Sequence, residues 1–244
     1  MPDPQLQQDL RAVARLKIYF GHQSVGQNLI DGLKELALRN DVPALRFVSA
    51  DSLPDGGEAY FADSRIGENH KPDLKCAAFS AQMSALLKQA PPDVAFMKFC
   101  YSDIDRDSDV QAVFDRYRAT IDSLKAAAPH VRLAHFTVPL TVGTSSLRKM
   151  LFSLLGRQGT ADLSNVRRNE FNALLRDYYR DEQVFDIAEA QSTDPEGRAV
   201  TFMVDGAPYR RMYDGYASDD GAHMNPEGSR FVARRLSRFL ALVR

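Results

Sequence analysis

The stretch Lys17-Ile-Tyr-Phe-Gly-His-Gln-Ser-Val-Gly26 changes from a strand pattern to a helix pattern. Residues 17–20 form a short β-type run that stops at Gly21. From Val25 onward, apolar residues recur at the spacing of one helix face, at Leu29, Ile30, Leu33, Leu36 and Ala37. Ser24 therefore falls at the junction where a predicted strand ends and a predicted helix begins.

The rest of the chain repeats this alternation. Predicted strands cover residues 17–20, 45–50, 93–100, 131–138 and 183–187, and predicted helices cover 6–16, 25–37, 73–89, 110–128, 165–179 and 226–243. The run 93–100 is nearly all apolar, which is typical of a central parallel strand covered on both faces. Strands that alternate with helices predict a mostly parallel sheet with helices on both faces, so we expect residues 1–244 to form one α/β domain.

Two connections in this pattern are long. Residues 51–72 are polar and rich in glycine, and they predict a loop. Residues 138–165 contain the apolar run Met150-Leu-Phe-Ser-Leu-Leu155. This insertion is either a lid or substrate wall, or a short extra helix packed on the core, and the sequence leaves both open.

The charges of the chain nearly cancel, with 31 Lys and Arg residues against 32 Asp and Glu residues. This balance gives no overall field that would favour nucleic acid or an anionic membrane. No window is apolar for long enough to span a membrane, and residues 1–5 lack the pattern of a signal peptide. We expect a soluble protein, either cytoplasmic or exported with a signal peptide absent from this chain, and its oligomeric state stays open. Cys76 and Cys100 fit no metal-binding spacing and are expected to be buried free thiols.

Ser24 is a candidate nucleophile because of its place in the predicted sheet. Active sites of open α/β sheets lie beyond the carboxyl ends of the strands. At such a turn, backbone N–H groups and the positive end of a helix could stabilise an oxyanion. The alternative is that Ser24 only caps the helix, which is a routine role for serine.

A candidate base lies just before the last predicted helix, in Asp219-Asp-Gly-Ala-His-Met-Asn-Pro-Glu-Gly228. Asp220 and His223 are close enough for the carboxylate to hold one ring nitrogen while the other takes the Ser24 proton. The alternative is that the Asp and Asn residues cap the final helix and that His223 is a surface residue.

With Ser24 after the first strand and Asp220-Gly-Ala-His223 before the final helix, the chain resembles the SGNH/GDSL hydrolase superfamily over essentially its whole length. The resemblance implies a flavodoxin-like, three-layer α/β/α sandwich with a mostly parallel sheet of about five strands. It also implies hydrolysis of acyl esters by Ser24, His223 and Asp220 without a metal or other cofactor. The Gly-Asp-Ser-Leu of the family is here Gly21-His-Gln-Ser-Val, which marks a divergent branch.

The resemblance also implies where an oxyanion would be bound. The glycine of the family follows the second strand and is matched by Gly67, whose N–H would be a donor, although a plain loop turn is the alternative. The asparagine of the family follows the third strand, and here Ser102 occupies its position in Cys100-Tyr-Ser-Asp103. Asn69 on the neighbouring loop is the preferred replacement, because serine has a shorter side chain with one proton to donate.

Further residues near these positions are candidates for substrate binding, namely His22, Gln23, Tyr101 and Asp103. His22 could instead be a hydrogen-bonded residue at the strand end. For His70, in the loop after the predicted second strand, simple exposure to solvent is the alternative to a role in the site. Asp103 could instead order the loops around Ser24. A metal site built from these histidines and Asp220 is not expected, because their spacing matches no helical ligand pair.

Three functions are compatible with these residues. The first is a serine esterase that hydrolyses a small-molecule or carbohydrate ester through an acyl-enzyme. An acetyl group is expected only from the breadth of the family. The second is an acyltransferase that uses the same triad with another hydroxyl as acceptor. The third is a carbohydrate- or ligand-binding protein that keeps the fold but has lost turnover with the missing asparagine.

Overall fold

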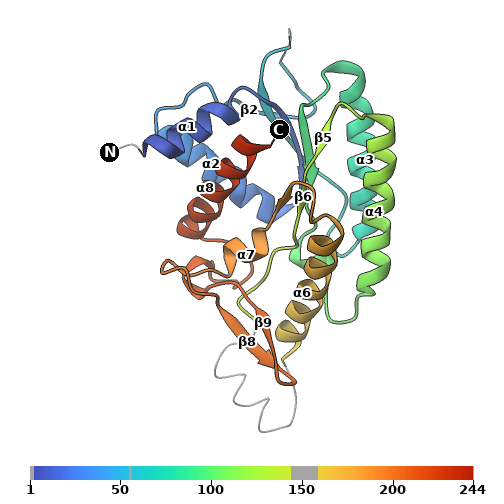
Figure 1. The fold of residues 1–244 in the computed structure, drawn as a ribbon, viewed down its shortest axis with the longest axis vertical. Coiled ribbons are helices and arrows are strands. Elements are labelled where there is room, and N and C mark those ends of the chain that lie inside the picture. Colours follow the sequence, from blue (N-terminus) through green and yellow to red (C-terminus); the bar gives the residue numbers. More distant parts are fainter. Residues whose placement is uncertain (1–2, 55–56, 144–158, 244) are drawn as a thin grey trace.

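A computed structural model describes residues 3–54, 57–143 and 159–243 of the chain. Its centre is a five-stranded parallel sheet with the strand order β2-β3-β1-β4-β5 (Figure 1). The strands are β1 (Lys17–His22), β2 (Phe47–Ser49), β3 (Tyr60–Arg65), β4 (Val94–Met97) and β5 (Arg132–Leu133). Because the strands are parallel, the carboxyl ends of β1, β3 and β4 meet at one edge, where Ser24 follows β1.

Helices cover both faces of this sheet (Figure 1). One face carries α1 (Pro4–Val13), α2 (Ser24–Arg39) and α8 (Pro226–Leu242), with the short α7 (Ile187–Gln191) beside them. The other face carries α3 (Pro72–Gln89), α4 (Val110–Ala127) and α6 (Thr160–Tyr178). This arrangement confirms the predicted three-layer α/β/α sandwich.

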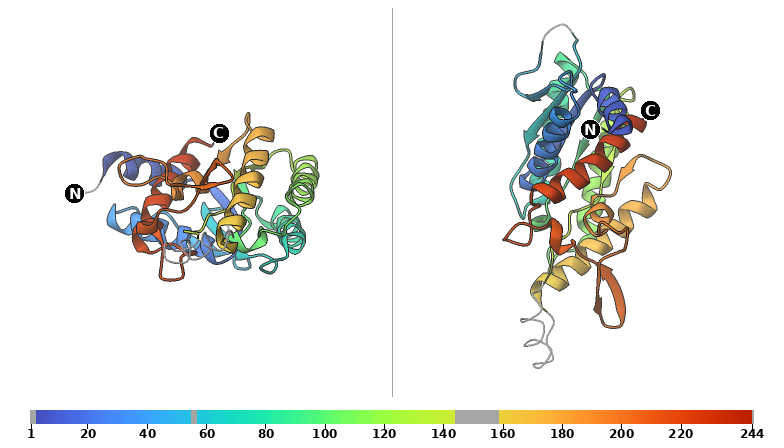
Figure 2. Two further views of the ribbon diagram at one scale, coloured as in Figure 1. Left: turned by 90° about the horizontal axis from the view of Figure 1, so that it is seen from below. Right: turned by 90° about the vertical axis from the view of Figure 1, so that its left-hand side faces the viewer.

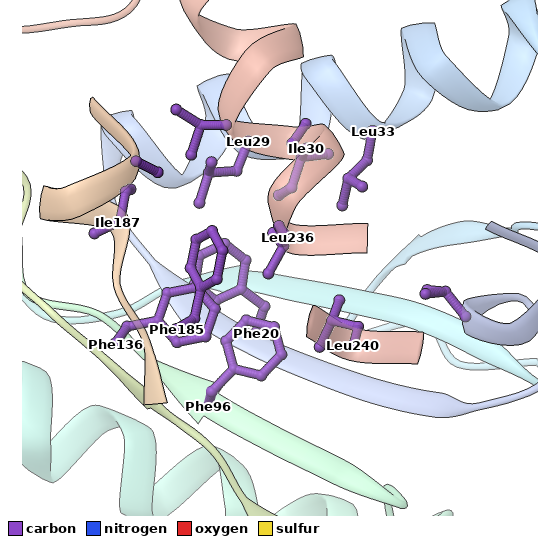
Figure 3. Close-up of a cluster of buried hydrophobic side chains, with 14 of the residues drawn as sticks. Phe20, Leu29, Ile30, Leu33, Phe96, Phe136, Phe185, Ile187, Leu236 and Leu240 are labelled. Carbon is purple, nitrogen blue, oxygen red and sulfur yellow. The ribbon is translucent and has the colours of Figure 1, made fainter. Parts of the chain in front are cut away.

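Aromatic side chains form the core beneath α2 and α8 (Figure 3). Phe20, Phe96 and Phe136 are all buried, and the Phe96 and Phe136 rings stack with centroids 4.4 Å apart. Aliphatic side chains of the two helices cover these rings, namely Leu29, Ile30, Leu33, Leu236 and Leu240. Each buried side chain of this size contributes roughly 1.5–3 kcal/mol. This core therefore packs α2 and α8 together over the face of the sheet that contains β1.

The strand predicted at 131–138 is divided in two. β5 pairs with β4, whereas β6 (His135–Phe136) pairs in parallel with β7 (Val184–Phe185). The strand predicted at 183–187 is shorter than expected, because Ile187 already begins α7.

The loop predicted over residues 51–72 is wrong in part, because it contains β3, the strand next to β1. Only the first half of β3 is apolar, in Tyr60-Phe-Ala62. Asp63 and Ser64 follow at the carboxyl edge, where Asp63 contacts His22 and Ser64 bonds the Tyr19 hydroxyl at 2.8 Å. The polar residues that made this segment resemble a loop are therefore the ones that form side-chain contacts at the carboxyl edge of the sheet.

A hairpin of β8 (Thr201–Val204) and β9 (Ala207–Arg210), which projects beyond the helices (Figure 2, right), is not among the predicted strands. Its turn consists of Asp205 and Gly206, with φ values of 49° and 79°. Asp-Gly is a favoured pair for such a turn, so the signal was present in the sequence. Of the predicted insertion 138–165, residues 144–158, including the run 150–155, lie outside the described residues. None of the helices in the described part of the chain is both long and apolar enough to span a membrane.

Candidate active site

Ser24 is the first residue of α2, and its side chain does not cap the helix. The N-cap position is held by Gln23 in an extended conformation, without a capping side-chain hydrogen bond. The Gln23 amide instead donates to the carbonyl groups of Ile66 and Gly67, at 2.9 Å and 2.8 Å. The hydroxyl of Ser24 is therefore available to another partner, and the helix-cap alternative is wrong.

Two glycines allow helices to pack closely on both faces of β1. A Cβ atom on Gly26 of α2 would lie 2.3 Å from the His22 ring of β1, and one on Gly21 of β1 would lie 2.9 Å from the Phe79 ring of α3. Real Cβ atoms do not approach so closely, so a side chain at Gly26 would force α2 away from β1, and one at Gly21 would force α3 away from it. The glycines of the opening stretch therefore help to place Ser24.

The partner of the Ser24 hydroxyl is His223. Ser24 Oγ lies 2.8 Å from His223 Nε2, and the other ring nitrogen, Nδ1, bonds to Asp220 Oδ2. A carboxylate only accepts hydrogen bonds, so Nδ1 carries the proton and Nε2 is left to accept the proton of Ser24. The structure thus brings together the three residues predicted as nucleophile, base and orienting acid.

Asp220 is held in place by the turn that contains it. Its Oδ1 accepts hydrogen bonds from the N–H groups of Ala222 and His223, both at 2.9 Å, and from the Ser218 hydroxyl at 2.8 Å. Burial would raise the pKa of Asp220, but the hydrogen bonds from these groups and from the His223 ring hold that pKa far below its ordinary value. Asp220 is therefore a carboxylate at any pH at which His223 could act as a base.

Gly67 lies beside the Ser24 junction. Its φ of 55° and the backbone of Lys75, 2.6 Å from where a Cβ would be, require glycine at this position. Its carbonyl accepts from Gln23, and among the described residues none accepts a hydrogen bond from its N–H. The Ser24 N–H, at the start of α2, likewise belongs to the groups that a helix leaves without an internal partner. Both N–H groups are available to bind an oxyanion.

The loop after β4 contacts Ser24 through Cys100. Cys100 Sγ lies 3.9 Å from Ser24 Oγ. Ser102 Oγ is buried and has no hydrogen-bond partner of ordinary geometry within the described ranges, and Ser102 contributes to lowering the pKa of the Cys100 thiol. Asn69 is exposed, and its Oδ1 accepts a hydrogen bond from Lys75 Nζ at 3.1 Å. The choice of Asn69 or Ser102 as the replacement for the family asparagine stays a prediction.

Asp103 has a structural position behind this loop. It forms a fully buried ion pair with Lys75, with 2.5 Å between Nζ and Oδ2. It also accepts hydrogen bonds from the N–H groups of Cys100 and His70, at 2.6 Å and 3.0 Å. All of these partners are protein groups, and Asp103 is only 4% exposed. These contacts favour the alternative that Asp103 orders the loops around Ser24 over the prediction that it contacts substrate. The exposed His70 side chain fits its simpler role.

His22 and Gln23 also lie behind the surface of the site. The His22 ring is fully buried, and its nitrogens contact Asp63 Oδ2 at 3.0 Å and the Gln23 carbonyl at 2.8 Å. Because both nitrogens are occupied, His22 holds the junction instead of contacting substrate. Gln23 has the same kind of role, since its amide is bound to the Gly67 loop.

Tyr101 is the expected substrate-binding residue that faces the triad. Its ring meets the His223 ring edge to face, with centroids 5.7 Å apart. The buried Arg168 guanidinium lies 5.6 Å from the Tyr101 ring, and its Nε donates to the Tyr101 carbonyl at 2.8 Å. Sequence reasoning missed Arg168, as well as Cys100 and Lys98 as neighbours of the site. Lys98 gave the clearest signal, as the one charged residue inside the apolar run 94–100.

Within residues 3–54, 57–143 and 159–243, no three His, Cys, Asp or Glu side chains form a group that could hold a metal ion.

Comparisons with known proteins identify a family for this chain and structures that share its fold. The family model for the SGNH domain (fused to AT3 domains) matches residues 23–238. A protein from Streptococcus pneumonia, proposed to be a platelet activating factor, has a similar structure, with 14% identity and a TM-score of 0.54 over 97% of this chain and 91% of that one. A protein from Desulfitobacterium hafniense DCB-2, proposed to be a lipolytic protein of the G-D-S-L family, has 11% identity and a TM-score of 0.51 over 91% of this chain and 98% of that one.

A carbohydrate esterase family 3 protein from Talaromyces cellulolyticus is also similar, with 12% identity and a TM-score of 0.50 over 91% of this chain and 93% of that one. At these identities, the three structures show a shared fold. Among curated proteins, none matches this sequence.

Proposed function

This chain belongs to the SGNH domain family, and from that premise we propose that it is a serine hydrolase that cleaves acyl esters. The observation that carries the proposal is the 2.8 Å hydrogen bond between Ser24 Oγ and His223 Nε2, which joins residues 199 positions apart. With Asp220 on the other ring nitrogen, this is the arrangement that acyl transfer to a serine requires.

The first half of the reaction forms an acyl-enzyme. His223 Nε2 takes the Ser24 proton as Ser24 Oγ attacks the ester carbonyl carbon, and the carbonyl oxygen becomes an oxyanion. Asp220 stabilises the imidazolium that forms, without taking its proton. When the tetrahedral intermediate collapses, the bond to the alkoxy oxygen breaks and His223 gives its proton to the departing alcohol.

The second half releases the acyl group. A water molecule attacks the acyl-enzyme while His223 Nε2 takes one of its protons. Collapse of the second tetrahedral intermediate returns that proton to Ser24 Oγ and frees the carboxylic acid. The His223 side chain is 30% exposed, so water can approach it. The same exposure favours a second candidate, in which the hydroxyl of another molecule takes the acyl group.

We assign the oxyanion to the N–H groups of Ser24 and Gly67, with a third contribution from Asn69 or Ser102. The first two donors lie at a helix start and at a glycine whose N–H has no acceptor within the described ranges. Loss of one such donor typically lowers the rate by about a hundred- to a thousandfold. Alanine variants of Asn69 and Ser102 therefore identify the third donor, since only the donor's loss should lower kcat to this extent.

The substrate class that we propose is a small acyl ester of a carbohydrate, such as an O-acetyl sugar. The fold relative described as a carbohydrate esterase supports testing this class first. Tyr101, edge-on to His223, supports a sugar or acyl contact at the mouth of the site.

The test is the release of p-nitrophenol from p-nitrophenyl acetate by wild type and by Ser24→Ala. We expect turnover that depends on Ser24, and a fluorophosphonate adduct at Ser24 by mass spectrometry. A folded wild-type protein that gives neither adduct nor Ser24-dependent release, with several acyl lengths tried, would favour the binding-protein alternative. Adding an alcohol acceptor and measuring the new ester separates acyl transfer from hydrolysis.

A further inference from the structure

Two lysine side chains are buried next to this site, and they differ in how their charge is balanced. Lys75 forms its ion pair with Asp103 at 2.5 Å. Lys98, which directly follows β4, is 1% exposed, and its Nζ makes one long hydrogen bond, 3.4 Å to the Phe99 carbonyl. Throughout the described part of the chain, no carboxylate lies within ion-pair distance of Lys98. The fold therefore keeps a buried amine that lacks a balancing acid.

Such a group does not stabilise a fold. A buried charge that lacks a partner is unfavourable, and apolar residues of similar volume are often neutral or better for stability. Burial, opposed by the nearby Cys100 and Asp103, lowers the pKa of Lys98 to about 8. The amine is therefore mostly protonated at neutral pH. A buried ammonium that packing does not require indicates a role in the site.

The position of Lys98 relates its charge to Ser24. Its N–H donates to the Gly21 carbonyl at 3.2 Å, which places Lys98 beside the end of β1. Among the charges around Cys100, that of Lys98 has the largest effect, and together with Ser102 and Lys75 it outweighs burial and lowers the pKa of the thiol. Cys100 Sγ in turn lies 3.9 Å from Ser24 Oγ. The ammonium is thus close enough to act on Cys100, which contacts the nucleophile and lies in the same loop as Ser102.

We propose that Lys98 supplies, from behind Cys100, the positive charge that stabilises the negative charge developing at Ser24 during acyl transfer. The inference rests on the proposed function. Lys98 touches neither Ser24 nor the substrate, and it neither gives nor takes a proton, so it is a positioning charge. Lys98 and Cys100 are both buried, so little water lies on this side of Ser24 to screen the ammonium, and a fixed charge there can stabilise an oxyanion that is not in direct contact with it.

This role gives a pH dependence with a definite sign. The ammonium loses its proton as the pH rises through about 8, so the rate of acylation falls on the alkaline side. The titratable and charged groups around the amine are Cys100 in the same loop, Asp103 in the short 3-10 helix Tyr101–Asp103 and Lys75 on α3, while β1 presents the Gly21 carbonyl. A Cys100 thiolate would also oppose an oxyanion, and the variant Cys100→Ser separates the two causes.

The experiment compares Lys98→Met, which removes the charge and keeps the volume, with Lys88→Met, which removes an exposed lysine near the far end of α3. Readouts are kcat and KM for p-nitrophenyl acetate from pH 6 to 10, the rate of fluorophosphonate labelling of Ser24, and the thermal unfolding temperature. We expect Lys98→Met to lower kcat and the labelling rate by about 10- to 100-fold and to leave KM little changed. This loss of rate is smaller than the loss that follows removal of a direct oxyanion donor. The unfolding temperature of Lys98→Met should equal or exceed that of wild type. Its kcat should no longer fall as the pH rises through the alkaline range. Lys88→Met should match wild type.

The wild-type pH profile keeps the inference testable even if Lys98→Met does not fold, because the alkaline decline should persist in Cys100→Ser, shifted to lower pH since Cys100 raises the pKa of Lys98. A decline that Cys100→Ser abolishes overturns the inference, as does a Lys98→Met enzyme with the wild-type kcat across the pH range. In either case, Ser24-dependent turnover by wild type leaves the proposed function intact. Absence of both turnover and labelling in wild type overturns the proposed function and the inference together.

Discussion

Replacing Asp220 by asparagine tests whether this residue sets the proton position on His223. In the structure, Asp220 Oδ1 accepts from Ala222, His223 and Ser218, while Oδ2 faces His223 Nδ1. An asparagine that keeps its oxygen on these donors must turn its NH₂ group toward Nδ1. The ring proton then moves to Nε2, which faces Ser24, and His223 no longer accepts the proton of Ser24.

The size of the effect follows from the exposure of the acid. In Ser-His-Asp enzymes the same substitution lowers kcat about 10⁴-fold. Here the Asp220 side chain is 50% exposed, so water can solvate the imidazolium in its place. We therefore expect a loss of about 10³-fold in kcat/KM, which corresponds to about 4 kcal/mol of transition-state stabilisation.

The assay is the hydrolysis of p-nitrophenyl acetate, with circular dichroism as the check on folding. Asp219→Asn is the matched control, because Asp219 is the exposed neighbouring acid and within the described ranges makes no bond to His223. It should retain nearly the full rate. A folded Asp220→Asn protein with wild-type kcat/KM, or equal losses in the two variants, would refute the reasoning.

Three further changes test the support around the site. Lys75→Met leaves Asp103 buried without its partner and should lower the free energy of unfolding by about 3–5 kcal/mol, measured by urea denaturation. Gly26→Ala brings a Cβ against the His22 ring and should lower stability by about 1–3 kcal/mol and also slow turnover. Burial lowers the pKa of His135 to about 4. As the pH falls, the unfolded chain therefore binds a proton at this residue before the folded protein does, so His135 reduces stability between about pH 6.5 and pH 4. His135→Gln should therefore reduce the loss in the free energy of unfolding over this pH range by up to roughly 3 kcal/mol.

Each of these three predictions can be contradicted by a specific result. Lys75→Met with wild-type stability would mean that the buried pair contributes nothing over an apolar side chain. Gly26→Ala with unchanged stability and kcat would show that the ring of His22 can move without displacing Ser24. Equal pH slopes for wild type and His135→Gln, measured by denaturation at several pH values, would assign the acid-side loss to other groups.

The fold was predictable where hydrophobic periodicity is local. The change of pattern around Ser24 placed the end of β1 within two residues and the start of α2 within one, because each pattern depends only on neighbours in the chain. The strand β3 was not predictable in this way. Half of its residues are polar, since Asp63 and Ser64 bond His22 and Tyr19 at the sheet edge, and a pattern search takes polar residues for a loop.

The sequence alone determined the candidate triad, because Asp220-Gly-Ala-His223 is a local motif and Ser24 lies between a predicted strand and a predicted helix. Only the tertiary structure decided what lies behind them. His22 and Asp103 turned out to be enclosed by protein groups, and Lys98 to be a buried amine with no carboxylate at ion-pair distance in the described part of the chain. The physical reason is that burial and charge balance depend on every element that packs around a side chain. Such packing brings together residues as distant as Ser24 and His223, whereas a linear pattern records only which residues follow one another.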